Sequence, residues 1–334
     1  MSSATPTAAR VKIKRLAIGI LVFLAVYTGV WFLAAYQIET RLSAFLAGRS
    51  GSARTLECDD MAVRGFPFRI GLFCDSLRLD DRGNAASASF GALRSAAQVY
   101  WPGRAVIELD GPAEMRVSPD FGLSAVWSRL QASIDAGFSS LNRSSISADD
   151  PSGTLVLGSI GERLAFSAAH GELHLRRNGP DLDAAATLTR FDLKPADGPS
   201  LLPPLDSAVD LTVKDRADML GLGRLRAAAL RGASGEVRNL TLDFGNGLVT
   251  TASGPFTVSE DGLISGAFKL SMRDVEGWRR TLAAAFPEDE DTIDNTANML
   301  TALAAGAKDA SVTLNVRDGT AFLAFIPIGV LPTL

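Results

Sequence analysis

The chain contains two cysteines, Cys58 and Cys74, on either side of the segment "RGFPFRI". The midpoint between them falls at Phe66, within a Gly-Phe-Pro sequence that is typical of a chain reversal. Folding the flanks into a hairpin about this point places the cysteines on opposite strands, where Cα atoms ~4.5–5.5 Å apart suit a disulfide. We therefore predict a Cys58–Cys74 disulfide. Two free buried thiols are the alternative, whereas a redox or metal site fits less well because the spacing is not C-x-x-C.

The chain also contains two histidines, His170 and His174, and their i, i+4 spacing would suit a zinc site on a helix. However, they alternate with Leu173 and Leu175, which predicts a strand instead. Residues four apart on a strand are separated by ~13 Å, too far for one metal with ligand bonds of ~2.1 Å. We expect the following residues to form the solvent-facing side of a strand: His170, Glu172, His174 and Arg176.

Other catalytic patterns are weak. A Ser-His-Asp hydrolase would need one of these histidines, and no G-x-S-x-G segment accompanies them. The "GLG" at 221–223 lacks the third glycine of a dinucleotide fingerprint. The acidic run "EDEDTID" at 288–294 lacks the glycine of a calcium loop and is interpreted as a helix start, where acidic side chains complement the dipole. We expect no enzyme activity and no cofactor.

An uncharged apolar run of 21 residues covers 16–36 and is ~30 Å long as a helix, enough to cross a bilayer. The basic tail 1–15 precedes it, so the positive-inside rule places the N-terminus in the cytoplasm. The residues that flank or mark the ends of this anchor are Arg10, Lys12, Lys14, Arg15, Trp31 and Tyr36. A cleaved signal peptide is the alternative, but its apolar core is usually only ~7–15 residues.

The rest of the chain is acidic. Beyond the basic tail, 29 Lys and Arg face 37 Asp and Glu, a net charge near −8. This balance argues against nucleic acid as a partner, because nucleic-acid binders need a basic surface. Export through the membrane also explains the cysteine pair, since disulfides form in oxidising compartments.

Alternating apolar and polar residues dominate the sequence after residue 100 and predict strands with one buried and one wet face. Turn sequences separate these runs, such as "DGP" at 110–112, "NGP" at 178–180 and Asn246-Gly247. Short links imply antiparallel neighbours. We predict a mainly β (α+β) fold: a transmembrane helix followed by a long curved antiparallel meander, a half-pipe or incomplete barrel with a few covering helices.

Helical spacing predicts that residues 39–48 continue the anchor helix. It also predicts helices at 125–138, 216–230, 275–286 and 292–307, although Gly221 and Gly223 weaken the second. The proline-rich segment 198–206 is the best linker candidate. We therefore divide the exported part into a first β-rich half, 37–200, and a second β-rich half with C-terminal helices, 201–334.

The basic-flanked anchor, the cysteines around "RGFPFRI", the strand meander and the closing "IPIGVLP" at 326–332 resemble the DUF2125 proteins of alphaproteobacteria. The resemblance covers nearly the whole chain and supplies no catalytic residues. More loosely, the layout resembles that of the AsmA-like and YdgA-like envelope proteins. These resemblances imply a single-pass protein of the bacterial inner membrane with its body in the periplasm.

Two functions fit a long sheet with an apolar face. If the sheet is an open trough, it binds or helps transfer a lipid or another apolar envelope molecule, because a large exposed apolar surface normally marks a binding site. If the face is fully packed, the protein is a non-enzymatic scaffold or accessory subunit that contacts another envelope protein.

Overall fold

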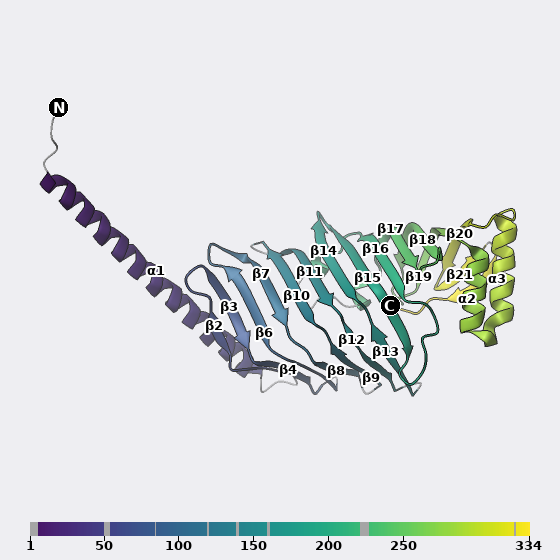
Figure 1. Ribbon diagram of the computed structural model, residues 1–334, viewed down its shortest axis with the longest axis horizontal. Helices are drawn as coiled ribbons and strands as arrows, with labels where there is room; N and C mark the ends of the chain where they lie inside the picture. The colour runs from purple at the N-terminus through teal and green to yellow at the C-terminus, as the bar shows by residue number, and fades with distance from the viewer. Residues whose placement is uncertain are drawn as a thin grey trace, which may run out of the picture.

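The computed structural model describes residues 6–49, 54–83, 85–118, 120–137, 140–158, 161–220, 227–323 and 325–334. Within them the chain forms a long N-terminal helix, one antiparallel sheet of 22 strands and two C-terminal α-helices (Figure 1). The sheet does not close into a barrel. The predicted fold class is therefore confirmed.

Helix α1 (Pro6–Arg49) has 44 residues and projects from one end of the sheet (Figure 1). It is long and apolar enough to cross a membrane, with a candidate span at Arg10–Ala44. Most of its large apolar side chains are exposed, as expected for a helix whose surroundings are lipid. The predicted continuation of the anchor helix through 39–48 is confirmed.

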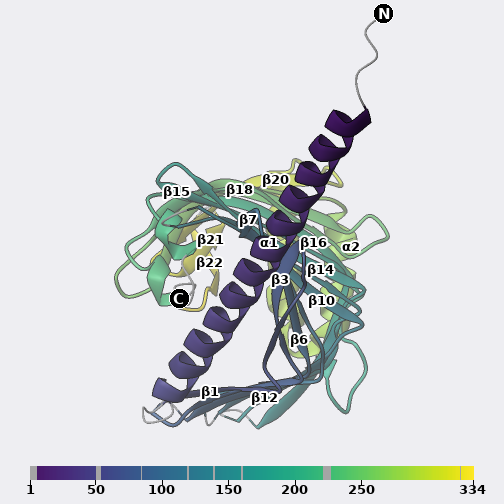
Figure 2. The ribbon, with the colours of Figure 1, turned by 90° about the vertical axis from the view of Figure 1, so that its left-hand side faces the viewer.

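The sheet bends along its length into two walls, which Figure 2 shows nearly end-on. The long wall runs through these strands in spatial order: β2 (Ala62–Arg64), β3 (Arg69–Cys74), β6 (Leu93–Gln98), β7 (Trp101–Leu109), β10 (Arg129–Ala136), β11 (Leu141–Asp149), β14 (His170–Asn178), β15 (Asp181–Pro195), β16 (Leu205–Val213), β17 (Ser234–Asp243), β18 (Val249–Val258), β19 (Ile264–Met272), β20 (Ala310–Arg317), β21 (Thr320–Leu323) and β22 (Ile326–Val330). The short wall consists of β1 (Arg54–Asp59), β4 (Ser76–Asp81), β5 (Ala86–Phe90), β8 (Ala113–Ser118), β9 (Phe121–Val126), β12 (Ser152–Leu157), β13 (Glu162–Ser167) and the last residues of β15.

The chain passes repeatedly from one wall to the other across a fold line of one to three residues. Backbone hydrogen bonds continue through this line: Asp75 donates to Asp59 at 2.8 Å, and Asp150 donates to Ala169 at 3.0 Å. Asp150 has φ 49°, and Arg190 has φ 50° where β15 makes the same bend. These extra residues change the face on which the following side chains lie. At most crossings the apolar positions therefore switch from odd to even residue numbers, or from even to odd.

This shift explains why the helix predicted at 125–138 is wrong. The segment crosses the fold line between β9 and β10, and its described residues are strands on both sides. Leu130 and Ile134 share a strand face at a period of two, while Val126 lies on the opposite face across the bend. The inserted residues produced an apparent i, i+4 pattern. Phe138 lies outside the described residues.

The other predicted helices had mixed outcomes. The helix predicted at 216–230 is also wrong: its described parts are short 3₁₀ turns, η1 (Ala217–Leu220) and η2 (Ala227–Leu230), and residues 221–226 lie outside the description. Helices at 275–286 and 292–307 are confirmed as α2 (Val275–Ala285) and α3 (Glu290–Leu303), with η3 (Pro287–Asp289) between them. Glu290 and Asp291 occupy the first turn of α3, although its N-cap side chain makes no capping hydrogen bond. The segment 198–206 leads from β15 into β16, and the division of the chain at this point stays a prediction.

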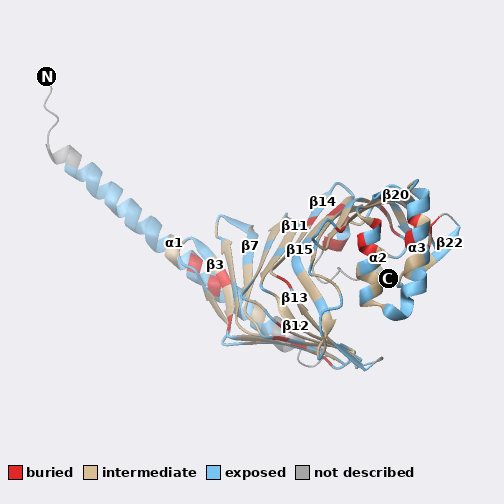
Figure 3. Cartoon of the chain, turned by 45° about the vertical axis from the view of Figure 1, so that its right-hand side comes forward, coloured by how far each residue is buried: buried red, intermediate tan, exposed pale blue. Residues whose placement is uncertain are grey.

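Two clusters of buried apolar residues lie in the described part of the chain, both toward its C-terminal end (Figure 3). In one, Met219 and Leu220 of η1 pack on Leu175, Leu182 and Val213 of the long wall. In the other, α2 and α3 cover the end of the sheet, around these residues: Val275, Ala297, Leu300, Ala310 and Leu323.

The Cys58–Cys74 disulfide is present, with Cα atoms 5.3 Å apart. The predicted hairpin about Phe66 is formed by β2 and β3. The cysteines are not direct cross-strand partners, since Cys58 of β1 pairs with Leu77 of β4. They lie on either side of the fold line instead, so the disulfide joins the short wall to the long wall.

Replacing both cysteines by serine should lower the free energy of unfolding by about 3 kcal/mol, the loop-closure value for ~15 residues. Denaturant unfolding of the full chain in mild detergent measures this change. The control is Ser87→Ala on the neighbouring strand β5, whose exposed side chain should contribute little. Equal stability of the double variant and the control would contradict the stapling role.

Candidate functional site

One side of the sheet, here called the inner face, bears Cys58 and Cys74 and lies on the concave side of the bend. Two observations place it there. The disulfide joins side chains of this face across the fold line, where side chains on the concave side converge. Small side chains of the same face are almost completely buried beside the fold line: Ala113, Ala125 and Ala168 are 2%, 8% and 9% exposed.

Apolar side chains form continuous cross-strand rows on the inner face of both walls. On the long wall one row pairs residues from β7 to β15: Ile107, Ala132, Ile146, Leu173 and Ala186. On the short wall a row crosses from β4 to β13: Leu79, Ala88, Met115, Leu123, Leu155 and Leu164. The alternation in the sequence is therefore the alternation between this face and its opposite.

These rows are only partly buried. Leu79 and Ile146 of the rows are each 41% exposed, and Leu193, which pairs with Phe166 on the same face, is 42% exposed. Most of the other large side chains in the rows have intermediate exposure, and neither cluster of buried residues extends to the short wall. Toward the C-terminal end, η1, α2 and α3 cover the same face. Within the described residues, no helix is packed on the inner face of the short wall from β4 to β13, whereas η1 reaches β11, β14 and β15 of the long wall (Figures 2 and 3).

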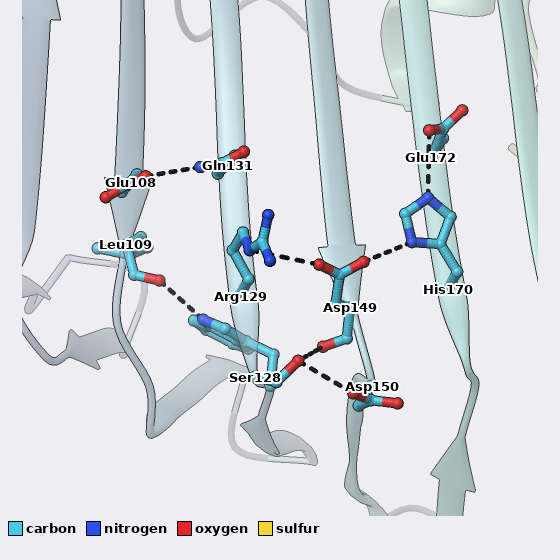
Figure 4. Close-up of polar contacts among 10 residues, drawn as sticks. Glu108, Leu109, Ser128, Arg129, Gln131, Asp149, Asp150, His170 and Glu172 are labelled. Atoms are coloured by element: carbon cyan, nitrogen blue, oxygen red, sulfur yellow. Dashed lines mark hydrogen bonds and ion pairs between the residues drawn. The ribbon is translucent and has the colours of Figure 1, made fainter.

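The opposite, outer face carries a polar network beside the fold line (Figure 4). The two ring nitrogens of His170 lie 2.7 Å from Asp149 and 3.1 Å from Glu172. Glu172 also reaches His174 at 3.1 Å, and Asp149 pairs with Arg129 at 3.5 Å. Each side chain is between about one-third and two-thirds exposed, so the network is a solvated surface rather than an enclosed site.

The two histidines thus lie on the outer face of β14, with Glu172 between them. Among the described residues, no group of three or more His, Cys, Asp or Glu could hold a metal ion. The outer face also has two broad depressions of about 650 and 770 Å³. The first has a charged lining that includes Glu57, Arg78 and Glu114 on the short wall.

Charge pairing shifts two pKa values in this network. Hydrogen bonds to Glu172 and then Asp149 raise the pKa of His170 above its ordinary 6.5. Hydrogen bonds from His170 and His174 lower the pKa of Glu172 below its ordinary 4.5. The stabilising effect of protonated His170 is therefore complete below pH 6.5 and is lost as the pH rises through the raised value. The stabilising effect of ionised Glu172 is present above pH 4.5 and is lost as the pH falls through the lowered value. Protonated His170 and ionised Glu172 therefore stabilise the fold together at mildly acidic pH.

The predicted anchor residues occupy different surroundings along α1. Arg10, Lys12, Lys14 and Arg15 are exposed at the start of the candidate span, and Tyr36 is 64% exposed. Trp31 is only 5% exposed, because it packs against Phe66 of the β2–β3 turn with ring centroids 5.5 Å apart. This contact could not be predicted, since the packing of a turn on the anchor helix follows from neither periodicity nor charge.

The sequence matches the family described as "Uncharacterized protein conserved in bacteria (DUF2125)" over residues 31–332. The chain belongs to the DUF2125 family. No curated protein matches it, and no solved structure matches it. Neither comparison shows a similarity to AsmA-like or YdgA-like proteins. The match covers every strand of both walls and the part of α1 from Trp31 onward, so this DUF2125 protein has its family region in the sheet and in the adjoining end of the helix.

Glu172→Gln should lower the pKa of His170 toward 6.5, because the neutral amide no longer favours the charged ring. NMR titration of the imidazole signals measures the shift, and the chain's two histidines make assignment direct. The control is Glu114→Gln, which removes a carboxylate from the outer face of the short wall without touching a histidine. A His170 pKa that responds equally to both substitutions would contradict the pairing.

Proposed function

We propose that this DUF2125 protein is anchored by α1 in the bacterial inner membrane, with its N-terminus in the cytoplasm and its sheet in the periplasm. Its inner face then binds, or helps transfer, a lipid or another apolar envelope molecule. The basic residues before the apolar run support the orientation through the positive-inside rule. The Cys58–Cys74 disulfide supports it as well, because disulfides persist in oxidising compartments.

The observation that carries the lipid proposal is the contrast between the two ends of the inner face. Where η1, α2 and α3 lie on it, apolar side chains form buried clusters. Between the two walls the same kind of side chain stays partly exposed. Leaving such a surface in water costs roughly 25 cal/mol for each Å² that could be buried. A bound apolar molecule would recover this free energy.

The size of the surface fits an acyl chain. The row from Ile107 to Ala186 crosses five strands and so extends ~19 Å at ~4.8 Å per strand. One leaflet contributes about half of the ~30 Å hydrocarbon core of a bilayer, which is the length of one extended acyl chain. The row is therefore long enough to hold a chain across the strands.

We also propose that the protein is not an enzyme and that its function needs no cofactor. Both cysteines are joined in the disulfide. Both histidines lie in the solvated network of the outer face, away from the apolar rows. The inner face thus offers side chains suited to binding by apolar contact rather than to nucleophilic or acid–base chemistry.

The proposed orientation predicts the behaviour of a C-terminal reporter. Alkaline phosphatase fused after Leu334 should be active in cells, because it folds only when exported, and a green fluorescent protein fused there through the general export route should be dark. Moving the basic charge, by replacing Arg10, Lys12, Lys14 and Arg15 with glutamate, should reduce phosphatase activity. A bright fluorescent fusion with inactive phosphatase would overturn the orientation and the periplasmic setting with it.

Neighbouring residues of one strand give a matched test of lipid binding. Ile146 lies on the inner face of β11, and Ser147 lies next to it on the outer face. A photo-crosslinking amino acid at Ile146 of the full chain in living cells should give lipid adducts, detected by mass spectrometry of the purified protein. The same group at Ser147 should give several-fold fewer. Equal adduct yields at the two positions would contradict the proposal.

A scaffold function has one specific observation in its favour. Strand β22 is an edge strand that pairs with β21, and its neighbourhood exposes large apolar side chains: Phe325, Ile326 and Val330 are 90%, 50% and 77% exposed. Exposed edges with apolar side chains can pair with a strand of another protein. In the same crosslinking experiment, a single protein adduct at Val330 with no lipid adduct at Ile146 would favour the scaffold.

A further inference from the structure

The turn between β2 and β3, Gly65 to Phe68, packs against the apolar part of α1. The hydroxyl of Tyr27 in the helix donates a hydrogen bond to the carbonyl of Pro67. Trp31 donates its indole N–H to the carbonyl of Arg69 at 3.1 Å. Phe66 stacks on Phe32 with ring centroids 5.6 Å apart. The turn is therefore attached to the helix over two of its turns.

These contacts fall inside the apolar run rather than at its end. The run ends at Tyr36, and Tyr27 lies nine residues earlier. At ~1.5 Å per residue, Tyr27 is ~13 Å from the end of the run along the helix axis. With the membrane anchoring of the proposed function, in which this run of 21 residues spans the hydrocarbon core, the turn lies level with lipid.

The backbone of the turn is suited to such surroundings. In lipid, backbone carbonyls have no water to bond and need partners within the protein. The carbonyl of Gly65 accepts from the N–H of Arg69 at 2.9 Å, and that of Phe68 accepts from Val99 at 3.1 Å. Those of Pro67 and Arg69 accept from the two side chains of α1. Proline at position 67 also removes one N–H that would otherwise need an acceptor.

The bond from Val99 connects this turn to a second one, between β6 and β7. Together the two turns expose four aromatic side chains at one corner of the long wall: Phe66, Phe68, Tyr100 and Trp101 are 45%, 69%, 73% and 54% exposed. Aromatic side chains are enriched where proteins meet the boundary between lipid and water. A water-facing corner would gain nothing from such a cluster.

Basic side chains outnumber acidic ones at this corner. Segments 61–74 and 95–107 contain Arg64, Arg69 and Arg104 and no Asp or Glu, although the chain as a whole is acidic. Arg104 lies over the ring of Trp101, 5.3 Å from its centroid, and it is also ion-paired at 2.9 Å with Asp135, its direct cross-strand partner on β10. Arginine binds phosphate well, so the exposed Arg64 and Arg69 are suited to meet lipid headgroups.

We propose that the β2–β3 and β6–β7 turns form a second membrane attachment, inserted beside α1 into the leaflet that faces the sheet. The ligand of this surface is the phospholipid bilayer itself, with aromatic rings among the acyl chains and arginines at the phosphates. This inference rests on the membrane anchoring of the proposed function but does not require lipid on the inner face. It places one end of the trough at the membrane surface, where a lipid could reach the inner face without crossing water.

Lipid-depth quenching tests the attachment. The full chain carrying Tyr100→Cys is labelled with an environment-sensitive fluorophore and placed in nanodiscs of phosphatidylethanolamine and phosphatidylglycerol that contain spin-labelled lipid. Because the native cysteines form a disulfide, the new cysteine is the labelled position. The control is Asn178→Cys, the exposed last residue of β14, which lies on the same edge of the long wall.

We expect the fluorophore at position 100 to be quenched several-fold more than the one at 178. The triple variant Phe68→Ser, Tyr100→Cys, Trp101→Ser should reduce quenching at position 100 toward the control. Equal quenching at both positions overturns the attachment, and so does shielding of position 100 by a protein partner without quenching by lipid. If position 100 is quenched but no lipid adducts form at Ile146, lipid binding to the inner face is contradicted while the second membrane attachment is supported.

Discussion

The hydrogen-bond ladder runs without interruption through the bend between the two walls, and this continuity governs the rest of the molecule. Strands such as β15 belong to both walls, so their angle is set by backbone geometry rather than by side-chain packing. At each crossing the inserted residues keep the apolar side chains of the strand on the concave side of the bend. The apolar rows of the two walls consequently face the same concave space.

A sheet of one layer must then deal with an apolar face, and this chain does so in two ways. Over the C-terminal strands it supplies its own cover, with Trp278 of α2 buried against Phe244 and with α3 packed beside it. Over the N-terminal strands the disulfide and the backbone hydrogen bonds hold the walls together, but few side chains or helices cover the inner face. In the proposed function, the covered end holds the fold, while the uncovered end is left for the apolar ligand.

The sequence was informative where a single physical rule acted alone. Alternation identified the strands and their faces, and Gly65-Phe66-Pro67 identified the hairpin that brings the cysteines together. Helices α2 and α3 could be predicted because amphipathic spacing was followed by proline and acidic residues. Prediction failed where two rules overlapped: at Val126, Leu130 and Ile134, a bend within alternating strands imitates the spacing of a helix.

Other features had no local signal. The fold line depends on residues such as Asp150 and Arg190 that adopt positive φ, which neither residue type reveals by itself. The docking of the β2–β3 turn on α1 joins segments about forty residues apart through Tyr27 and Trp31. An apolar helix and an aromatic turn each have several possible partners, and only the three-dimensional arrangement selects this one.

The shared strand β15 at one end and the Cys58–Cys74 bond at the other fasten the two walls together at both extremities. A clamshell motion, in which the walls swing apart and close again, would break one fastening or the other. A ligand bound between the walls must therefore move along the inner face or leave over its open edge. The direction of movement would then depend on the binding partners at the two ends of that face.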